Sequence, residues 1–298
     1  MKEKEGLACV ILNYNDSETT LSLINKIKTY EILDYIVIVD NQSSDNSLEK
    51  LRKIQTSKII VICSEKNGGY GYGNNYGIWY IKENLKNIRY VLIANPDTMF
   101  EENLIKELKY LMGQHPNCVI AAPEHMNTIQ DVAWKEISAR RFILQSSYVF
   151  CRIFGRKEKY TKEELKRQNY KVDMVLGALL LIEIDKFIKM GMYDEGIFLY
   201  TEETVIGKRA KKYQYETRLL PETTYQHTHS VTISKAYRSA LKQKKLNLKS
   251  DLYYLKKYCG LSGVTLGMTK LYFVLAVLEM YPIQAYLFLK NMFIRKLQ

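Results

Sequence analysis

The chain has 298 residues, 47% of them hydrophobic, which is enough for one large α/β domain with an appendage. Its five cysteines are scattered without a CxxC pair, which excludes a CxxC metal or redox site and favours free thiols in a reducing compartment. The net charge of +12 is concentrated after residue 234, where twelve Lys and Arg residues accompany only two acids. This imbalance predicts a surface that meets an anionic partner, either phospholipid or nucleic acid.

Strands and helices alternate through the first part of the chain. Apolar runs that end in polar residues predict strands at 7–12, 35–39, 59–63 and 90–94. Helices are expected after the first three strands, beginning near Ser17, Ser44 and Asn74. This alternation is typical of βαβ units around a mainly parallel sheet.

The pattern is less regular after residue 119. We expect strands at 119–122, 175–184 and 216–220, with helices at 186–191 and 204–212. Beyond residue 234 the sequence predicts helices only. The predicted organisation is therefore an α/β domain over 1–233 and a basic helical region over 234–298.

The most informative segment is Asn95-Pro96-Asp97, which follows the apolar run 91–94. A series of Val, Leu and Ile suits a strand buried on both faces, and proline ends the pairing. The carboxylate of Asp97 is thereby fixed at the carboxyl edge of a central strand, where open α/β sheets bind ligands. A hard cation that bridges two phosphates prefers such an oxygen.

Asp40 ends the run 36–39 in the same way and could accept hydrogen bonds from a nucleobase or ribose. The alternative, of about equal weight, is a turn residue that caps the following helix. The glycine-rich segment 67–77 follows the third strand and does not complete GxGxxG, so it is no dinucleotide fingerprint. Its glycines would still permit a close approach of the backbone to a ligand.

Glu202 and Glu203 form a carboxylate pair in which one member could act as a general base. The alternative is a solvated helix N-terminus, where the helix dipole favours acids. His227, in a His-x-His sequence, could supply a metal ligand, although surface histidines are usually inert.

Seven segments then match one family in its own order. They are Val10-Ile11-Leu12-Asn13-Tyr14-Asn15, Val39-Asp40-Asn41-Gln42-Ser43-Ser44-Asp45, the glycine-rich 67–77, Asn95-Pro96-Asp97, Gly177-Ala178, residues 191–203, and His227 with Ser230. Together they resemble glycosyltransferase family 2, and within it the rhamnosyltransferase-like branch. The resemblance covers about residues 7–232.

The resemblance implies a GT-A fold and a nucleotide-sugar donor. It places the donor against Asn13, Asn15, Asp40, Asn67, Gly68, Gly73, Asn74, Asn75, Asn95 and Asp97. Asp97, with His227, would hold Mg²⁺ or Mn²⁺ on the diphosphate, and Glu203 would be the base, with Glu202 as the alternative. The family's later acid is missing, because Glu202-Glu203 is followed by Thr204-Val205.

The reaction implied is an inverting transfer from dTDP-rhamnose or a UDP-sugar to a lipid-linked glycan of bacterial surface polysaccharide. A sugar nucleotidyltransferase is disfavoured, because residues 7–20 lack a basic, glycine-rich triphosphate loop. A non-catalytic nucleic-acid-binding protein would leave the acid-terminated strands unexplained, so we expect no nucleic-acid partner.

The C-terminal part contains apolar stretches broken by single charges. The uncharged stretch 271–278 is too short to span a bilayer, and two helices separated near Pro282 are expected. With the lysine-rich residues 235–257 they could lie on an anionic leaflet, which predicts a cytoplasmic protein peripheral to the inner face of the plasma membrane. The alternative is packing against the catalytic domain or against a second subunit in a homodimer.

Overall fold

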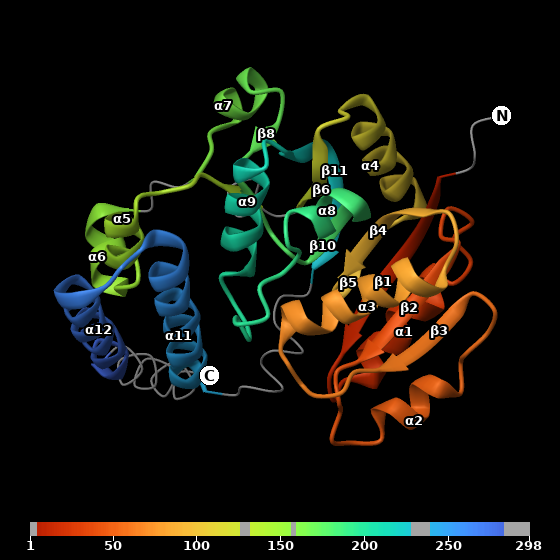
Figure 1. Cartoon of the computed structure of the whole chain (residues 1–298), viewed down its shortest axis with the longest axis horizontal. Coiled ribbons are helices and arrows are strands. Elements are labelled where there is room, and N and C mark those ends of the chain that lie inside the picture. Colours follow the sequence, from red (N-terminus) through yellow and green to blue (C-terminus); the bar gives the residue numbers. More distant parts are fainter. Residues whose placement is uncertain (1–4, 126–131, 156–158, 228–238, 283–298) are drawn as a thin grey trace, which may run out of the picture. The chain divides into compact units, whose positions relative to one another are not determined.

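A mixed β-sheet with helices on both faces forms the core of the larger of two compact units in the computed structural model (Figure 1). The structure describes residues 5–125, 132–155, 159–227 and 239–282. The first seven elements are β1 (Gly6–Asn13), α1 (Ser17–Ile27), β2 (Tyr35–Asp40), α2 (Ser47–Arg52), β3 (Ile59–Cys63), α3 (Tyr70–Asn84) and β4 (Ile88–Ala94). This part follows the predicted alternation of strands and helices.

The later elements are shorter and less regular. They are β5 (Thr98–Met99), α4 (Glu102–Gln114), β6 (Cys118–His125), β7 (Ala133–Trp134), α5 (Ala139–Leu144), α6 (Tyr148–Phe154), α7 (Lys162–Arg167), β8 (Lys171–Val172), β9 (Met174–Val175), β10 (Leu179–Glu183), α8 (Ile184–Lys189), α9 (Glu202–Lys212), β11 (Glu216–His227), α11 (Ala240–Cys259) and α12 (Gly263–Leu278). The single strand expected at 175–184 is wrong, because Leu176, Gly177 and Ala178 separate β9 from β10 and the two strands pair with different partners.

The strand order of the large sheet is β3-β2-β1-β4-β10-β6-β11-β5, with β8 added to β11. Strands β3, β2, β1 and β4 are parallel, so their carboxyl ends share one edge. Strand β10 enters antiparallel between β4 and β6. The residues that precede β10 therefore lie at the same edge as those that follow β4.

The core has two layers because alternate residues of each strand face opposite sides. Leu7, Cys9 and Ile11 of β1 belong to one cluster, together with apolar side chains of α1 and α4. Ala8 and Val10 belong to the other cluster, with side chains of α3, α8 and α9. Residues 7–11 of β1 are completely buried, as expected for a strand covered on both faces.

Helix α3 begins at Tyr70, so the glycine-rich segment is a loop only as far as Gly69. The expected start at Asn74 is wrong. The glycines before it belong to the helix, because they let its first turns pack closely on the sheet. A Cβ atom on Gly73 would lie 2.2 Å from a methyl group of Leu12 in β1. The glycine at this position therefore serves the packing of helix on strand.

Two compact units account for the chain, one of residues 1–136 and 159–236, the other of 137–158 and 237–298. The second unit thus includes α5 and α6, which the sequence analysis had placed in the catalytic domain. Side-chain contacts explain this, since the Phe142 and Tyr254 rings lie 5.1 Å apart and the Tyr272 hydroxyl donates to the Leu144 carbonyl. The described part of the basic region, 239–282, contains helices only, as expected.

The uncharged stretch 271–278, predicted to be too short to span a bilayer, is part of a longer apolar helix. The helix from Gly263 to Pro282 is long and apolar enough to cross a membrane, and it is the one such helix among the described residues. Lys270 lies within α12, and Glu279 is the C-cap residue that follows Leu278. The second helix expected after Pro282 lies outside the described residues.

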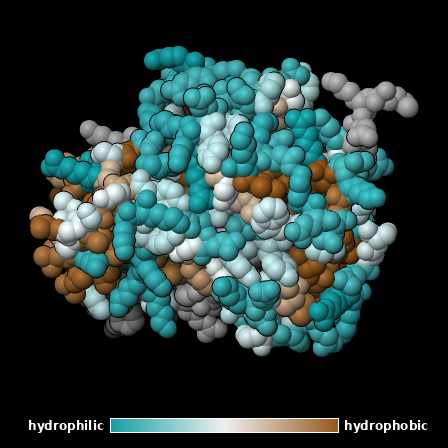
Figure 2. Space-filling model, viewed as in Figure 1, coloured by the Kyte–Doolittle hydropathy of each residue, from teal (hydrophilic) through white to brown (hydrophobic). Residues whose placement is uncertain are grey.

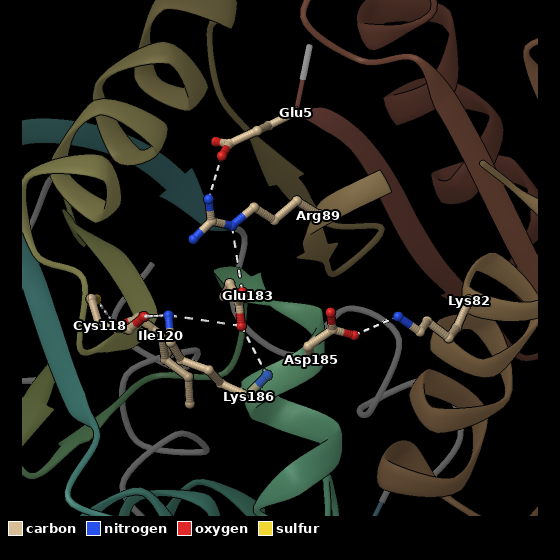
Figure 3. A network of polar contacts seen from close by, with 8 residues as sticks. All are labelled: Glu5, Lys82, Arg89, Cys118, Ile120, Glu183, Asp185 and Lys186. Carbon is tan, nitrogen blue, oxygen red and sulfur yellow. Dashed lines mark hydrogen bonds and ion pairs between the residues drawn. The ribbon is translucent and has the colours of Figure 1, made fainter. Parts of the chain in front are cut away.

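A polar network lies at the sheet edge opposite Asp97 (Figure 3). Glu183, at the end of β10, accepts a hydrogen bond from the backbone N–H of Lys186 at 2.8 Å and lies 3.4 Å from Nε of Arg89 in β4. Arg89 also pairs with Glu5, and the Lys186 ammonium donates to the Cys118 carbonyl. The network ties the start of β4 and of β6 to the end of β10.

Replacement of Glu183 tests this network. We expect Glu183→Ala to lower the free energy of unfolding by about 1–3 kcal/mol, because it removes a helix cap and a nearly buried carboxylate partner. The matched control is Asp185→Ala, whose pair with Lys82 is largely exposed and should change stability by less than about 0.5 kcal/mol. Urea denaturation measures both. Equal effects of the two substitutions would contradict the assignment.

Candidate active site

The buried side chain of Asp40 links the C-terminal ends of β1 and β2. Asn13 and Asp40 are paired in register, and the Asn13 amide donates to Asp40 Oδ2 at 2.8 Å. Ser43 donates its backbone N–H to Oδ1 and its hydroxyl to Oδ2 of the same carboxylate. Asp40 is completely buried. Asp40 is therefore a turn residue but does not cap α2, whose N-cap is Asn46, so the helix-capping alternative is wrong. The contact of Asp40 with a nucleoside stays a prediction.

Asn15 joins the loops that follow these two strands. Its side-chain oxygen accepts from the backbone N–H of Ser44 at 2.8 Å, and its amide donates to the Ser44 hydroxyl. Both Asn15 and Gln42 have positive φ, 52° and 60°, which is uncommon outside glycine. Such conformations often gather at ligand sites, where the surrounding structure holds them in place.

The start of α3 is anchored by side-chain amides. The Asn41 amide donates to Asn67 Oδ1 at 3.0 Å and to the Gly69 carbonyl at 3.1 Å. Gly69 has φ +93°, and a Cβ there would lie 2.0 Å from the carbonyl oxygen of Phe198. Gly68 precedes this contact and donates its N–H to the Lys66 carbonyl. The loop is thus fixed against the segment before α9.

Two predicted donor residues, Asn74 and Asn75, are buried within α3. Asn75 donates to the Tyr193 carbonyl and to Glu195, and accepts from the Tyr193 N–H, so it holds the loop before α9. Asn74 donates to the Tyr70 carbonyl, and no donor among the described residues reaches its buried side-chain oxygen. In this structure the contacts of Asn75 are therefore internal, and a donor role for either residue stays a prediction.

Asp97 and His227 are brought together, as the metal prediction requires. Asp97 Oδ1 lies 3.1 Å from His227 Nε2, and the two side chains are only 7% and 9% exposed. Strand β5 pairs with the end of β11, which sets His227 opposite Thr98. Burial, together with the negative charge of Asp97, raises the pKa of Tyr225.

Asp97 and His227 fit a divalent cation, but they supply only part of the ligands that it needs. A carboxylate and an imidazole that converge at this distance can supply two ligands, and the phosphate oxygens of a nucleotide can supply others. No cluster of three His, Cys, Asp or Glu side chains suited to a metal occurs among the described residues. Such a pair would hold the cation chiefly in the presence of the nucleotide.

Glu202 and Glu203 open α9 and differ in their surroundings. Glu202 is 4% exposed, and within the described residues no hydrogen-bond donor reaches its Oε1. Glu203 is partly exposed and accepts from the Gly177 N–H at 3.3 Å. The solvated helix start that we considered as the alternative therefore does not describe Glu202.

Burial raises the pKa of both carboxyl groups, and for Glu202 the charge of Glu203 raises it further. The Gly177 N–H acts in the opposite direction on Glu203, since it favours the ionised form. The two residues before them, Tyr200 and Thr201, have φ values of 70° and 72°. Backbone strain of this kind persists where the surrounding structure fixes a functional geometry.

A backbone hydrogen bond places the segment of Asp97 next to the segment that contacts Glu203. The Asn95 N–H donates to the Ala178 carbonyl at 2.9 Å, beside the Gly177 N–H that contacts Glu203. Asp97 follows two residues after Asn95. The acids at the ends of β2 and β4 and at the start of α9 therefore lie along one edge of the sheet, rather than in separate regions.

The sequence analysis did not identify Tyr70 as a member of this arrangement. Its hydroxyl donates to the Gly177 carbonyl at 2.7 Å, and its ring meets that of Tyr193 edge-on at 5.7 Å. Tyr70 thus holds Gly177, whose N–H contacts Glu203. No local signal could have shown this, because the hydrogen bond joins residues 107 positions apart.

Comparison with known proteins identifies the family of the chain. The sequence profile of the family described as Glycosyl transferase family 2 matches residues 8–190. The chain belongs to this family, as predicted. The match includes Asp40 and Asp97 and ends before Glu202 and His227, so the roles of the latter two are not covered by it.

Two relatives have related activities in their names. The chain is 29% identical over 208 residues to the low-salt glycan biosynthesis hexosyltransferase Agl10 of Haloferax volcanii, covering 70% of this chain and 62% of that protein. It is 24% identical over 199 residues to the rhamnosyltransferase WbbL of Escherichia coli K12, covering 57% of this chain and 73% of that protein. The chain thus spans less than two thirds of the Haloferax protein.

A solved structure shares the fold. GalNAc-T7, crystallised with UDP, GalNAc and Mn²⁺, superposes with a TM-score of 0.59 at 14% identity, covering 76% of this chain and 44% of that one. Identity at this level shows the fold alone. The predicted GT-A fold is confirmed, with the nucleotide-sugar type of α/β sheet described above.

The metal pair can be tested by binding. We expect Asp97→Asn to weaken Mn²⁺ binding in the presence of UDP at least about tenfold, because it removes the charged ligand. The measurement is the Mn²⁺-dependent rise in unfolding temperature at fixed UDP. The control Asp185→Asn, at the opposite edge of the sheet, should behave as the parent protein. An unchanged response of Asp97→Asn would exclude this residue as a ligand.

The raised pKa of Glu202 predicts a pH dependence of stability. A buried carboxyl that prefers the neutral form stabilises the fold at low pH, and this contribution is lost as the pH rises through the raised pKa. Glu202→Gln should therefore increase the free energy of unfolding at pH 8 by about 1–3 kcal/mol and change it little near pH 4. Denaturation at both pH values measures this. Glu18→Gln, at an exposed site in α1, is the control, and a pH-independent gain would contradict the prediction.

Proposed function

We propose that this chain transfers a sugar from a nucleotide-diphosphate donor to an acceptor hydroxyl with inversion at the anomeric carbon. The observation that carries the proposal is the shared position of two groups at the end of the β4–β10 pair. The Asp97–His227 pair lies there, and so does Glu203, held by Gly177. Family membership and the fold support the same reaction class.

Glu203 is proposed as the base. The acceptor hydroxyl forms a bond to the anomeric carbon while the bond to the diphosphate oxygen breaks, and the Glu203 carboxylate takes the hydroxyl proton. A base is most effective when its pKa lies near the working pH, and burial raises that of Glu203 in this direction. Glu203 is the more exposed member of the pair, whereas Glu202 is nearly completely buried.

Glu202 then has an electrostatic role. Because its pKa is raised well above the ordinary value by burial and by Glu203, it is the member that retains a proton. A neutral Glu202 leaves the negative charge on Glu203, where the proton is taken up. Two adjacent ionised carboxylates would repel each other and would both be partly desolvated.

Asp97 and His227 would hold Mg²⁺ or Mn²⁺. When bound, such a cation neutralises the charge that develops on the departing diphosphate. Asp97 contributes a negative charge in a largely buried position, and the pairing of β5 with β11 fixes His227 beside it. The Mn²⁺ and UDP in the GalNAc-T7 crystal support this assignment by analogy of fold.

For the substrate we propose an activated rhamnose and a lipid-linked glycan, as in bacterial surface-polysaccharide synthesis. The similarity to the rhamnosyltransferase WbbL supports the sugar, and that to a glycan-biosynthesis hexosyltransferase supports a glycan acceptor. The first experiment is a thermal-shift screen of dTDP-rhamnose and UDP-hexoses with Mn²⁺. Stabilisation by a UDP-hexose and not by dTDP-rhamnose would overturn the choice of rhamnose.

Turnover tests the base. With the donor identified by that screen and a polyprenyl-diphosphate-linked sugar as acceptor, we expect Glu203→Gln to lower kcat by about 10²–10⁴ while donor binding persists. Release of nucleoside diphosphate measures turnover, and the donor-induced thermal shift measures binding. Glu83→Gln, exposed near the end of α3, is the control. Normal turnover by Glu203→Gln would show that another group takes the proton.

A further inference from the structure

The second unit has apolar side chains that face solvent on two helices. The apolar platform is defined here as those residues of α6, of α12 and of the turn that follows α12 whose large hydrophobic side chains are 50–79% exposed. They are Tyr148, Val149, Ile153, Phe154, Val264, Met268, Leu271, Val274, Leu275, Leu278 and Tyr281. Figure 2 shows apolar residues gathered on the surface over these helices. Exposed patches of this kind mark interaction sites.

The platform is one surface although its halves are distant in the sequence. Glu279 in the last turn of the α12 segment accepts from the Ser147 hydroxyl at 2.8 Å and from the Tyr148 N–H. The Tyr272 hydroxyl donates to the Leu144 carbonyl at 3.0 Å. Glu279 therefore caps α6 and fixes it beside α12, across more than 130 positions of chain.

Helix α12 is apolar on both of its sides. Thr269, Phe273 and Ala276 are at most 5% exposed and form its inner side. The platform residues form its outer side and meet no protein in the described part of the chain that would bury them. A helix that is hydrophobic all round is buried in protein or in lipid, and the described residues cover only one side of α12.

The same unit is strongly cationic. In 137–155 and 239–282 there are two acids, Asp251 and Glu279, and ten cations: Arg140, Arg141, Arg152, Lys242, Lys244, Lys245, Lys249, Lys256, Lys257 and Lys270. Exposed lysines at 242, 245, 249 and 256 recur at intervals that set them on one face of α11. Arg152 and Lys270 are exposed on the platform helices themselves.

These two features together identify the kind of partner. A second copy of the chain would bring two cationic units together, and like charges oppose such an association. A surface that combines apolar side chains with an excess of Lys and Arg matches the boundary between headgroups and acyl chains of an anionic bilayer. Lysine stems can cover apolar surface while the ammonium groups remain in the headgroup layer.

We propose that the apolar platform lies in the surface of an anionic lipid bilayer, with α6 and α12 in the plane of the membrane. The inner side of α12 packs within its unit, and Glu279 binds the start of α6, so both constrain α12 to lie along the surface instead of across it. This inference does not depend on the proposed glycosyl transfer. It gives a route by which a lipid-carried acceptor could be reached.

Vesicle flotation with the full chain tests the platform. We expect the protein to float with vesicles of phosphatidylcholine and phosphatidylglycerol, and much less with phosphatidylcholine alone. The combined variant Leu271→Gln, Leu275→Gln, Leu278→Gln should weaken partitioning at least about tenfold, because three apolar anchors are lost. Its unfolding temperature should be unchanged, since all three side chains are already more than half exposed. Tyr110→Gln, which changes a 70% exposed residue of α4, is the control and should bind normally.

Two further experiments test the role of the α11 lysines and the orientation of the platform helices in the bilayer. The variant Lys245→Gln, Lys249→Gln, Lys256→Gln should lose the preference for anionic vesicles. Alkaline carbonate should release the bound protein, because it does not span the bilayer. Equal binding by the platform variant and the parent would overturn the proposal, and so would resistance to carbonate. A concentration-dependent dimer in sedimentation equilibrium, dissociated by the platform variant, would assign the surface to a second copy.

Discussion

The pairing of β4 with the antiparallel β10 is the constraint on which the rest of the site depends. Asp97 follows the C-terminal end of β4, and Gly177 precedes the start of β10. The hydrogen bond from the Asn95 N–H to the Ala178 carbonyl closes this pair at the site edge. Without the reversal at β10, Glu203 would have no partner at the edge that carries Asp97.

Packing of α3 on the sheet supports this arrangement from the other side. Small residues let the helix approach β1, and its first turn contacts the segment before α9 through Gly69 and Tyr70. The Tyr70 hydroxyl donates to the Gly177 carbonyl, so the start of α3 contacts both Asn41 and the residue whose N–H binds Glu203. Backbone groups from several elements thus satisfy one another's hydrogen bonds at this edge of the sheet.

The two units differ in the charged and apolar side chains that they expose. The first has acids at a sheet edge and a core buried on both sides of β1. The second has few acids, many lysines and an apolar outer side on α12. The proposed catalytic role of the first unit and the proposed lipid binding of the second would together suit chemistry on an amphiphilic acceptor.

The sequence by itself determined the alternation of strands and helices, the acids at strand ends and the family. These features depend on local periodicity and on short motifs, which are visible in a single chain. The tertiary structure decided that Glu202 is buried and Glu203 accessible, that Asp97 meets His227, and that α6 joins α12. Each of these depends on contacts between residues far apart in the chain, which no local pattern specifies. Whether a carboxylate such as that of Glu202 is buried depends on how those distant segments pack around it.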